Sequence, residues 1–558
     1  IKQARNAFPP RHIADFLCNV CINYGTDYLF YFPHRKFRKM LHAFYADPES
    51  CGRLNKEFLC MALSCFAIGS QFAHLVDSRL SSIEFACLKT IPGIKFYNSA
   101  QALVPSLICD PSVESAQAFT MLSIYAFPFD ARGASWSYLG LALRTSLSIG
   151  LHKDTLDTEL SEADREIRRR TWWSIFLTER VSAIKLGLPE GISEVSVTTP
   201  LPQACWALDQ GQVNNNLELL LAYISLAKIW RAISEPITPR SVEEIHYLIR
   251  ELDAWRSSLP DSLTINGINK DSKLYRAVIH IHANYYHAWI ILCREPLIAL
   301  VKSKMANAAW ATASSGCSSA GTSQAQEFSD LCLNAARSML RLYEMLRKDN
   351  ILARFSFTDF QGCSTSAIIM LLYGVVDRDE TYDDYVDSAF EALSYMGTGC
   401  DKAQAAVQFI RGFRELTDEA YKRARNLSTN PTVSTTLEDL ELYEEWVVSC
   451  GETERAQNDG ALSLAAHEQE PNCVPLQAEN AASMVLATDS TDRGNDMAPV
   501  GISGASDWQS ETIHSTWLSG VGNDRESEAL TMDDLMNSSI PESFVADVTG
   551  INLLDFGF

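Results

Sequence analysis

Between residues 11 and 425, apolar side chains recur at the three- and four-residue spacing of amphipathic helices. Short stretches of Pro, Gly, Asp and Ser separate the segments, and none shows the sustained alternation typical of a half-buried strand. This pattern predicts an all-α fold. The expected helices are Arg11–Tyr24, Arg35–Tyr45, Asn55–Phe72, Ala86–Thr90 running toward Leu107, Val113–Tyr125, Ser135–Ile149, Ser161–Leu186, Leu217–Ile233, Val242–Leu259, Leu274–Val301, Gln326–Arg347, Phe360–Val376 and Val386–Arg425.

Two helix ends and one loop carry local signals. Ser161 precedes Asp164 by three residues, which resembles a capping box at a helix start, although Glu or Gln is the usual partner. Gly150 stands where a residue in the left-handed conformation ends a helix. Residues 306–324 are rich in Ala, Ser, Thr and Gly and cannot bury enough apolar surface to offset their ordering cost, which predicts a mobile loop.

The charge of the chain is divided at about residue 430. The net charge is -22, and residues 431–558 contain 24 acidic and 3 basic residues, which leaves 45 acidic and 44 basic residues in 1–430. Helical periodicity also fades beyond this point. The sequence therefore predicts a large multi-helix domain over residues 1–430, followed by an acidic and mostly disordered tail over residues 431–558.

Three general features limit the class of protein. No uninterrupted apolar stretch reaches the ~18–20 residues of a membrane helix, and Ala367–Val376 is too short, so no membrane partner is expected. The 15 cysteines are scattered through apolar segments, which favours reduced, intracellular thiols. The chain begins at Ile1 without an initiator Met or a secretory signal, so we expect its natural N-terminus to lie upstream.

Residues 112–202 contain the most informative motifs of the chain. They are, in order, Trp136 in a helix, Gly150-Leu151-His152, Glu166, Arg168-Arg169-Arg170, Trp172-Trp173, Glu179-Arg180, Gly187-Leu188-Pro189 and Pro200-Leu201-Pro202. This order and spacing resemble the middle homology region of fungal binuclear zinc-cluster transcription factors, although Glu179 stands where that family usually has Asp. Weaker marks extend the resemblance over residues 8–425: Tyr31–Phe37, Trp255 with Leu259-Pro260, and Tyr285-Tyr286 to Arg294-Glu295-Pro296, where Glu295 is a second departure.

The resemblance implies a nuclear regulator of RNA polymerase II transcription, with a helical regulatory domain that restrains or senses and an activating tail that recruits the transcription machinery. In this family a zinc cluster held by six cysteines binds DNA. That cluster is absent from this chain and is expected upstream of Ile1, so zinc and DNA are implied only for the missing part. The resemblance leaves open a small-molecule effector and a homodimer.

The motif residues by themselves are typical of a packing and ion-pair centre. The arginines of the expected helix 161–186 either face solvent or reach neighbouring carboxylates, and its Trp, Phe and Leu residues form an apolar stripe. Three arginines alone make a poor DNA-binding surface. We expect structural roles for Trp136, Gly150, His152, Glu166, Arg168, Arg169, Arg170, Trp172, Trp173, Glu179, Arg180 and Pro189, and no catalytic, metal-binding or DNA-binding residue in this chain.

Two patterns suggest other chemistry. Cys18 and Cys21 form a Cys-x-x-Cys pair, but they lie in an apolar helical segment without a second pair, which favours core cysteines over a zinc site. Asp383, Asp384 and Asp387 match the Asp-Asp-x-x-Asp pattern that binds Mg²⁺ and a diphosphate in α-helical isoprenoid synthases. Because this motif opens a helix, where Asp is a favoured cap, the non-enzyme interpretation is preferred.

The tail interleaves acidic residues with large apolar residues. Within residues 532–558 the apolar set is Leu535, Met536, Phe544, Leu553, Leu554 and Phe556. This composition predicts an activation segment that folds onto a coactivator, and the alternative is a solubilising or degradation-prone terminus. Leu437–Val448 is either a second such segment or a last helix docked on the body. A helical scaffold that lost DNA binding stays open as a third hypothesis for the whole chain.

Overall fold

The computed structural model describes residues 2–47, 56–76, 91–154, 159–234, 240–309, 319–398 and 401–429, which all belong to one compact unit. Every regular element in these ranges is a helix, so the predicted all-α fold is confirmed. The acidic tail, Leu437–Val448 and all six predicted activation residues lie outside the described residues. The helices are α1 (Lys2–Asn6), α2 (Arg11–Tyr24), α3 (His34–Ala46), α4 (Lys56–Phe72), α6 (Ile94–Gln101), α7 (Val104–Ile108), α8 (Val113–Ala126), α9 (Trp136–Ser148), α10 (Glu162–Leu186), α11 (Trp206–Asp209), α12 (Leu217–Ser234), α13 (Val242–Ser257), α14 (Tyr275–Ala309), α15 (Ser319–Lys348), α16 (Phe357–Val376), α17 (Tyr382–Gly397) and α18 (Asp401–Thr429).

The helix ends follow local chemistry where the sequence predicted them. Ser161 caps α10, since its hydroxyl accepts from the backbone N–H of Asp164 at 3.1 Å. The Asp164 carboxylate accepts from the Ser161 hydroxyl, so the reciprocal contact of a capping box is replaced by a side-chain pair. Gly150 and Gly187 follow α9 and α10 with φ of 73° and 63°, in the left-handed region that favours glycine.

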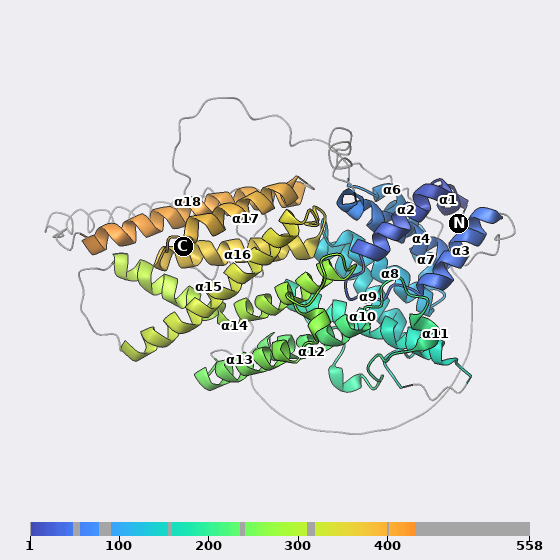
Figure 1. Ribbon diagram of the computed structural model, residues 1–558, viewed down its shortest axis with the longest axis horizontal. Helices are drawn as coiled ribbons and strands as arrows, with labels where there is room; N and C mark the ends of the chain where they lie inside the picture. The colour runs from blue at the N-terminus through green and yellow to red at the C-terminus, as the bar shows by residue number, and fades with distance from the viewer. Residues whose placement is uncertain are drawn as a thin grey trace, which may run out of the picture. The chain divides into compact units, whose positions relative to one another are not determined.

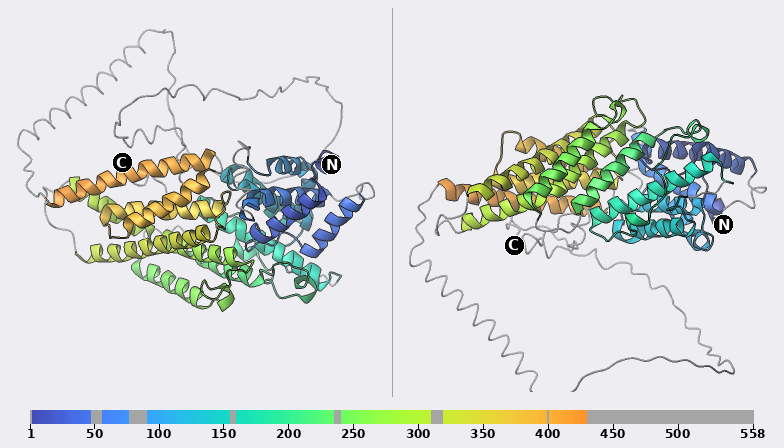
Figure 2. Two further views of the ribbon diagram at one scale, coloured as in Figure 1. Left: turned by 45° about the horizontal axis from the view of Figure 1, so that its top comes forward. Right: turned by 90° about the horizontal axis from the view of Figure 1, so that it is seen from below.

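The helices form two groups joined by α14. Helices α2, α4, α6, α8, α9 and α10 pack against one another at the N-terminal end, and α15, α16, α17 and α18 pack together at the other (Figures 1 and 2). Helix α14 contacts α12 and α13 as well as α15, α16 and α18. The two groups therefore share one continuous apolar core.

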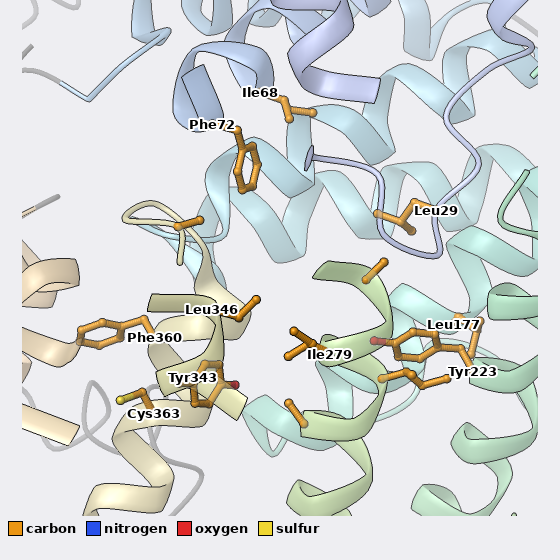
Figure 3. Packing of buried hydrophobic residues seen from close by; sticks show 14 of the residues in the cluster. Leu29, Ile68, Phe72, Leu177, Tyr223, Ile279, Tyr343, Leu346, Phe360 and Cys363 are labelled. Carbon is orange, nitrogen blue, oxygen red and sulfur yellow. The ribbon is translucent and has the colours of Figure 1, made fainter. Parts of the chain in front are cut away.

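Figure 3 shows this core where the two groups meet. Leu29 and Phe72 from the N-terminal segment approach Ile279 of α14, and Tyr343 of α15 and Phe360 of α16 lie on the other side. All five residues are buried. Burial of such side chains contributes roughly 1.5–3 kcal/mol each, so this junction is a major source of stability.

Two helices are long and apolar enough by composition to cross a membrane, although neither contains a long uninterrupted apolar run. They cover Lys56–Leu75 and Phe357–Val376. In both, 94% of the apolar window is buried inside the body. A helix that is apolar on all sides is typical of the centre of a large helical core, which is where both helices lie.

Several predicted boundaries were wrong. The predicted helix over residues 386–425 is two helices, since α17 ends at Gly397 and α18 begins at Asp401. Helix α14 continues past Pro296 to Ala309, and α15 begins at Ser319. Of the predicted loop 306–324, residues 306–309 and 319–324 are thus helical, and residues 310–318 are not described. The segment 91–108 contains two short helices, α6 and α7, instead of the end of one.

Candidate functional site

An ion-pair cluster occupies the first half of α10, at the Glu-x-Arg-Arg-Arg motif. Glu166 and Arg170 lie one helical turn apart and are 2% and 1% exposed. Arg170 Nε donates to Glu166 Oε1 at 2.8 Å, and Arg169 Nη1 donates to Glu166 Oε2 at 3.2 Å. A buried carboxylate is stable only when such partners replace its water. Glu166 therefore depends on both arginines.

Arg170 extends this cluster to the segment before α12. Its Nη1 donates to Asp209 Oδ1 at 2.7 Å and its Nη2 donates to the carbonyl oxygen of Gln203 at 2.9 Å. Asp209 in turn accepts from the backbone N–H of Cys205 at 2.8 Å, and the N–H of Gln203 donates to Glu166 at 2.9 Å. Glu166, Arg169, Arg170 and Asp209 form what we call the α10 ion-pair cluster, which fixes residues 203–209 against α10.

Three side chains of α10 donate to main-chain carbonyls of the segment that follows it. Arg180 Nη2 donates to Ile192 O at 2.8 Å, and Trp173 Nε1 donates to Pro200 O at 2.8 Å. The third such contact joins Arg170 and Gln203 O, and we call the three contacts the carbonyl row. As the donors move back along α10, the acceptors move forward along the chain. The segment 192–203 therefore runs antiparallel to α10.

Glu179 and Arg180 fix the turn that leaves α10. Glu179, which replaces the Asp usual in the resembled family, is 2% exposed and accepts from the backbone N–H of Gly191 at 2.6 Å. A Cβ at Gly191 would lie 2.6 Å from Leu143 Cδ2 and 2.9 Å from Glu179 Oε1, so a larger residue here would require these side chains to shift. Arg180 pairs with Glu190, and its guanidinium carbon lies 4.9 Å from the ring centroid of Phe176. Burial raises the pKa of Glu179 and lowers the pKa of Arg180.

The other motif residues surround this helix. Trp172 is fully buried, and the ring of His152 lies 5.8 Å from it. Arg168 is half-buried and donates to the carbonyl oxygen of Ile149, directly after α9, at 2.9 Å. Trp136 begins α9 and is half-buried, whereas Pro189 is exposed. Of the three adjacent arginines, Arg170 is therefore the buried one.

A second buried polar group was not predicted from the sequence. Asp27, Arg276, His280 and Asp359, the buried quartet, come from the turn after α2, from α14 and from α16. His280 Nδ1 lies 2.8 Å from Asp27 Oδ2, and His280 Nε2 lies 2.6 Å from Asp359 Oδ1. Arg276 Nη2 donates to Asp359 Oδ2 at 2.8 Å, and its Nη1 lies 3.7 Å from Asp27 Oδ1. The quartet thus joins the two groups of helices.

The charges of the quartet balance when His280 is protonated. Burial lowers the pKa of His280, but the carboxylates of Asp27 and Asp359 outweigh burial and raise that pKa above 6.5. Burial raises the pKa of both aspartates, while His280 and Arg276 together hold each pKa below 3.8. Two carboxylates, one guanidinium and one imidazolium then sum to zero. This balance is the condition under which a buried ionic group is stable.

The quartet left only weak signals in the sequence. Arg276 and His280 are one turn apart at the start of a helix that is otherwise largely apolar, and Ile279, labelled in Figure 3, lies between them in sequence. Asp27 has a φ of 42°, which Asp tolerates better than most residues. Neither feature indicates a partner, because Asp359 lies 83 residues beyond Arg276.

A buried lysine was also missed. Lys185, near the end of α10, is 7% exposed, and no acidic side chain pairs with it in the part of the chain that the structure describes. Its Nζ lies 5.6 Å from the ring centroid of Trp230, which itself packs against the His287 ring at 5.3 Å. Burial lowers the pKa of Lys185 to about 7. Burial thus favours the neutral form of this amine.

The cysteine pair lies inside the core. Cys18 and Cys21 are 2% and 0% exposed on α2, next to Cys65 of α4. Among the described ranges, no group of three or more His, Cys, Asp or Glu side chains is placed to hold a metal ion. The pair packs as small apolar side chains do.

The aspartates of the Asp-Asp-x-x-Asp pattern lie on the surface. Asp383 and Asp384 are exposed in the first turn of α17, where their charge favours the positive end of the helix dipole. Asp387 pairs with Arg414 of α18 at 3.0 Å. An isoprenoid synthase needs these carboxylates to share a cavity with the diphosphate, and the exposed arrangement does not favour that alternative.

Comparison with known proteins finds a family match over part of the chain. Residues 29–263 match the model of the fungal specific transcription factor domain. An uncharacterized transcriptional regulatory protein of Schizosaccharomyces pombe is 27% identical over 423 residues, which are 74% of this chain and 51% of that protein. The thiamine repressible genes regulatory protein thi1 of the same organism is 22% identical over 420 residues, 74% of this chain and 52% of that protein.

A budding-yeast protein shows the same kind of similarity. Activator of stress genes 1 of Saccharomyces cerevisiae is 26% identical over 283 residues, which are 47% of this chain and 29% of that protein. The chain thus spans about half the length of the first two relatives, and less of this one. The α10 ion-pair cluster and the carbonyl row lie within the matched residues 29–263.

Proposed function

We propose that this chain, whose residues 29–263 belong to the fungal specific transcription factor domain family, is the regulatory body and activating tail of a fungal transcription regulator. The observation that carries this proposal is the family match. The names of the similar proteins, which include transcriptional regulatory proteins and an activator, support it. The function follows from the match and not from the helical fold, since one fold can serve many functions.

We assign DNA binding to a zinc cluster outside this chain and the regulatory role to the helical body. The body contains 45 acidic and 44 basic residues over 1–430, so it lacks the excess of basic charge typical of nucleic-acid-binding domains. Action on DNA requires that the protein works in the nucleus. Zinc would then be the cofactor of the cluster.

We assign activation to the tail, because residues 431–558 contain 24 acidic and 3 basic residues interleaved with large apolar side chains. A reporter assay tests this assignment. The full chain, fused to an unrelated DNA-binding domain, is expected to activate a reporter gene with sites for that domain. Replacing Leu553, Leu554 and Phe556 together by Ser should abolish most of the activation, because these side chains would enter the coactivator groove.

The matched control replaces Ser538 and Ser539 by Ala in the same tail, which leaves the acidic and large apolar residues intact. This control is expected to activate like the unmodified fusion. A fusion that is expressed and nuclear but gives no activation would remove the tail from the proposal. Equal loss in both variants would show that the large apolar residues have no specific role.

A further inference from the structure

Three cysteines meet where α2 packs against α4, at the N-terminal end of the body (Figure 1). Cys18 and Cys21 lie about one turn apart on α2, and Cys65 of α4 lies beside both, close enough for its thiol to hydrogen bond with each. All three are free thiols. They are 2%, 0% and 0% exposed, so water does not separate them. The core thus holds thiols of two different helices in contact.

The backbones of α2 and α4 approach closely at this point. A Cβ at Gly69 would lie 2.2 Å from the carbonyl oxygen of Leu17 and 3.1 Å from its Cα. Leu17 directly precedes Cys18, and Gly69 lies one turn after Cys65. Packed helices usually keep their axes roughly 8–10 Å apart, whereas a disulfide needs its two Cα atoms about 4.4–6.8 Å apart. The glycine contact therefore favours the short separation that a disulfide requires.

The thiols on the two helices differ in acidity. The contact with Cys65 and the nearby cation of Arg38 lower the pKa of Cys18, although burial opposes them. Burial and the contacts with Cys18 and Cys21 raise the pKa of Cys65 well above its ordinary value. Because the thiolate is the nucleophile, Cys18 is the thiol that attacks an oxidant, and Cys65 stays protonated beside it.

Cys18 is also the thiol nearest to the surface. The next residue, Asn19, is exposed, and it accepts a hydrogen bond from Arg38 Nη2 of α3 at 2.6 Å. Arg38 is half-buried, and a side chain of this kind changes rotamer within nanoseconds. Hydrogen peroxide is small and uncharged, so it can reach Cys18 when the Arg38 side chain moves. Cys21 and Cys65 lie deeper in the core.

We propose that Cys18 and Cys65 are an oxidation site, at which hydrogen peroxide links α2 to α4 by a disulfide. The Cys18 thiolate attacks one peroxide oxygen, the O–O bond breaks, and the hydroxide that leaves takes up the proton that Cys18 released. The Cys65 sulfur then attacks the sulfenic acid on Cys18, and its hydroxyl group leaves as water with the Cys65 proton. Two thiols are oxidised, and one peroxide is reduced to two water molecules.

The site goes beyond the transcriptional role, because it is a chemical property of the folded chain and is tested without DNA or a reporter. The disulfide would close a loop that contains α3 and the turn with Asp27. A closed loop has fewer conformations in the unfolded state, so the oxidised chain should resist unfolding more than the reduced chain.

Peptide mapping by mass spectrometry tests the proposal. The purified full chain is reduced, freed of reductant, treated with hydrogen peroxide and then blocked with iodoacetamide. A cross-link between Cys18 and Cys65 is expected, together with a higher Tm, and dithiothreitol should reverse both. Arg38→Gln should slow the cross-link several-fold, because it removes the cation near the thiolate. Lys39→Gln removes the same charge from the exposed neighbouring position of α3 and should leave the rate unchanged.

A second pair of variants separates the two steps. Cys65→Ala removes the second thiol, so peroxide should leave a sulfenic acid on Cys18 that dimedone labels. Cys60→Ala is the matched control on the same helix, since Cys60 is buried and its thiol donates to Ala100 O at 3.6 Å. This control should form the cross-link as the wild type does. The proposal is overturned if the wild type forms no such cross-link, if Arg38→Gln reacts as fast as Lys39→Gln, or if folded Cys65→Ala gains no label at Cys18.

Discussion

His280 Nε2 lies 2.6 Å from Asp359 Oδ1, while the other ring nitrogen of this histidine lies 2.8 Å from Asp27. Both carboxylates raise the pKa of His280, which favours the imidazolium, the form that can pair with each of them. The contact between the turn after α2 and helices α14 and α16 therefore depends on a histidine that keeps its proton.

The first prediction concerns pH. The pKa of His280 is raised above 6.5 in the folded chain, so its stabilisation is complete below 6.5 and is lost as the pH rises through the raised pKa. The pKa values of Asp27 and Asp359 are held below 3.8, so their stabilisation is present above 3.8 and is lost as the pH falls through the lowered values. The quartet is expected to stabilise the chain most between these limits.

Urea unfolding of the wild type and of His280→Gln from pH 4 to pH 9 checks this. The difference in unfolding free energy should be largest below pH 6.5 and should shrink at higher pH. His42→Gln, at an exposed histidine near Asp15, serves as the control and should leave the pH profile unchanged. A difference that does not vary with pH would contradict the protonated His280.

The second prediction concerns the charge of Asp359. Asp359→Asn keeps the shape of the side chain but leaves Arg276 and His280 buried with only Asp27 as an acid. Breaking a buried pair in this way should destabilise the chain by about 3 kcal/mol or more. Asp387→Asn, in an exposed pair with Arg414, should cost less than about 1 kcal/mol. Equal costs in denaturant unfolding would refute the special role of the quartet.

The third prediction concerns the α10 ion-pair cluster. Arg170→Lys keeps the charge but cannot keep the contacts with Glu166, Asp209 and Gln203 O together, since an ammonium lacks the planar fork. We expect a loss of about 2 kcal/mol and faster hydrogen exchange at the N–H groups of Gln203 and Cys205. Arg347→Lys, in an exposed pair with Glu391, is the control and should change neither. Unchanged exchange in Arg170→Lys would count against the cluster as the anchor of 203–209.

The fourth prediction concerns Lys185. Its pKa is about 7 in the folded chain and 10.5 in the unfolded chain, so the cost of burying its charge is complete below pH 7 and vanishes above pH 10.5. Lys185→Met should stabilise the chain by about 2 kcal/mol or more near pH 7. The gain should fall between pH 7 and pH 10. Lys228→Met, exposed on α12, should give no comparable gain. A destabilised Lys185→Met would show that the amine has a partner that compensates its burial.

Features with a local cause could be predicted from the sequence. The range of α2 was predicted without error, and α10 begins one residue after Ser161 because that hydroxyl caps it. Features that depend on tertiary packing could not. Helix α14 continues through Pro296 because its neighbours α15 and α16 stabilise it, although proline removes one backbone donor.

The candidate sites show the same limit. The arginines of α10 were recognised from their spacing. Asp209, which pairs with Arg170, lies 39 residues away and could not be identified as its partner. The quartet joins positions from 27 to 359, so no window of sequence contains it. Charged residues inside apolar helices are a signal of such pairs, but a single sequence does not identify the partner.

The carbonyl row fixes the number of residues in the segment that follows α10. Its donors, Arg180, Trp173 and Arg170, contact main-chain oxygens at positions 192, 200 and 203, and every residue type supplies such an oxygen. The carbonyl row thus depends on the length of the segment and does not depend on the side chains at its three contact points. Related chains could differ in residue type at 192, 200 and 203, whereas an inserted or deleted residue between them would move every later oxygen out of reach.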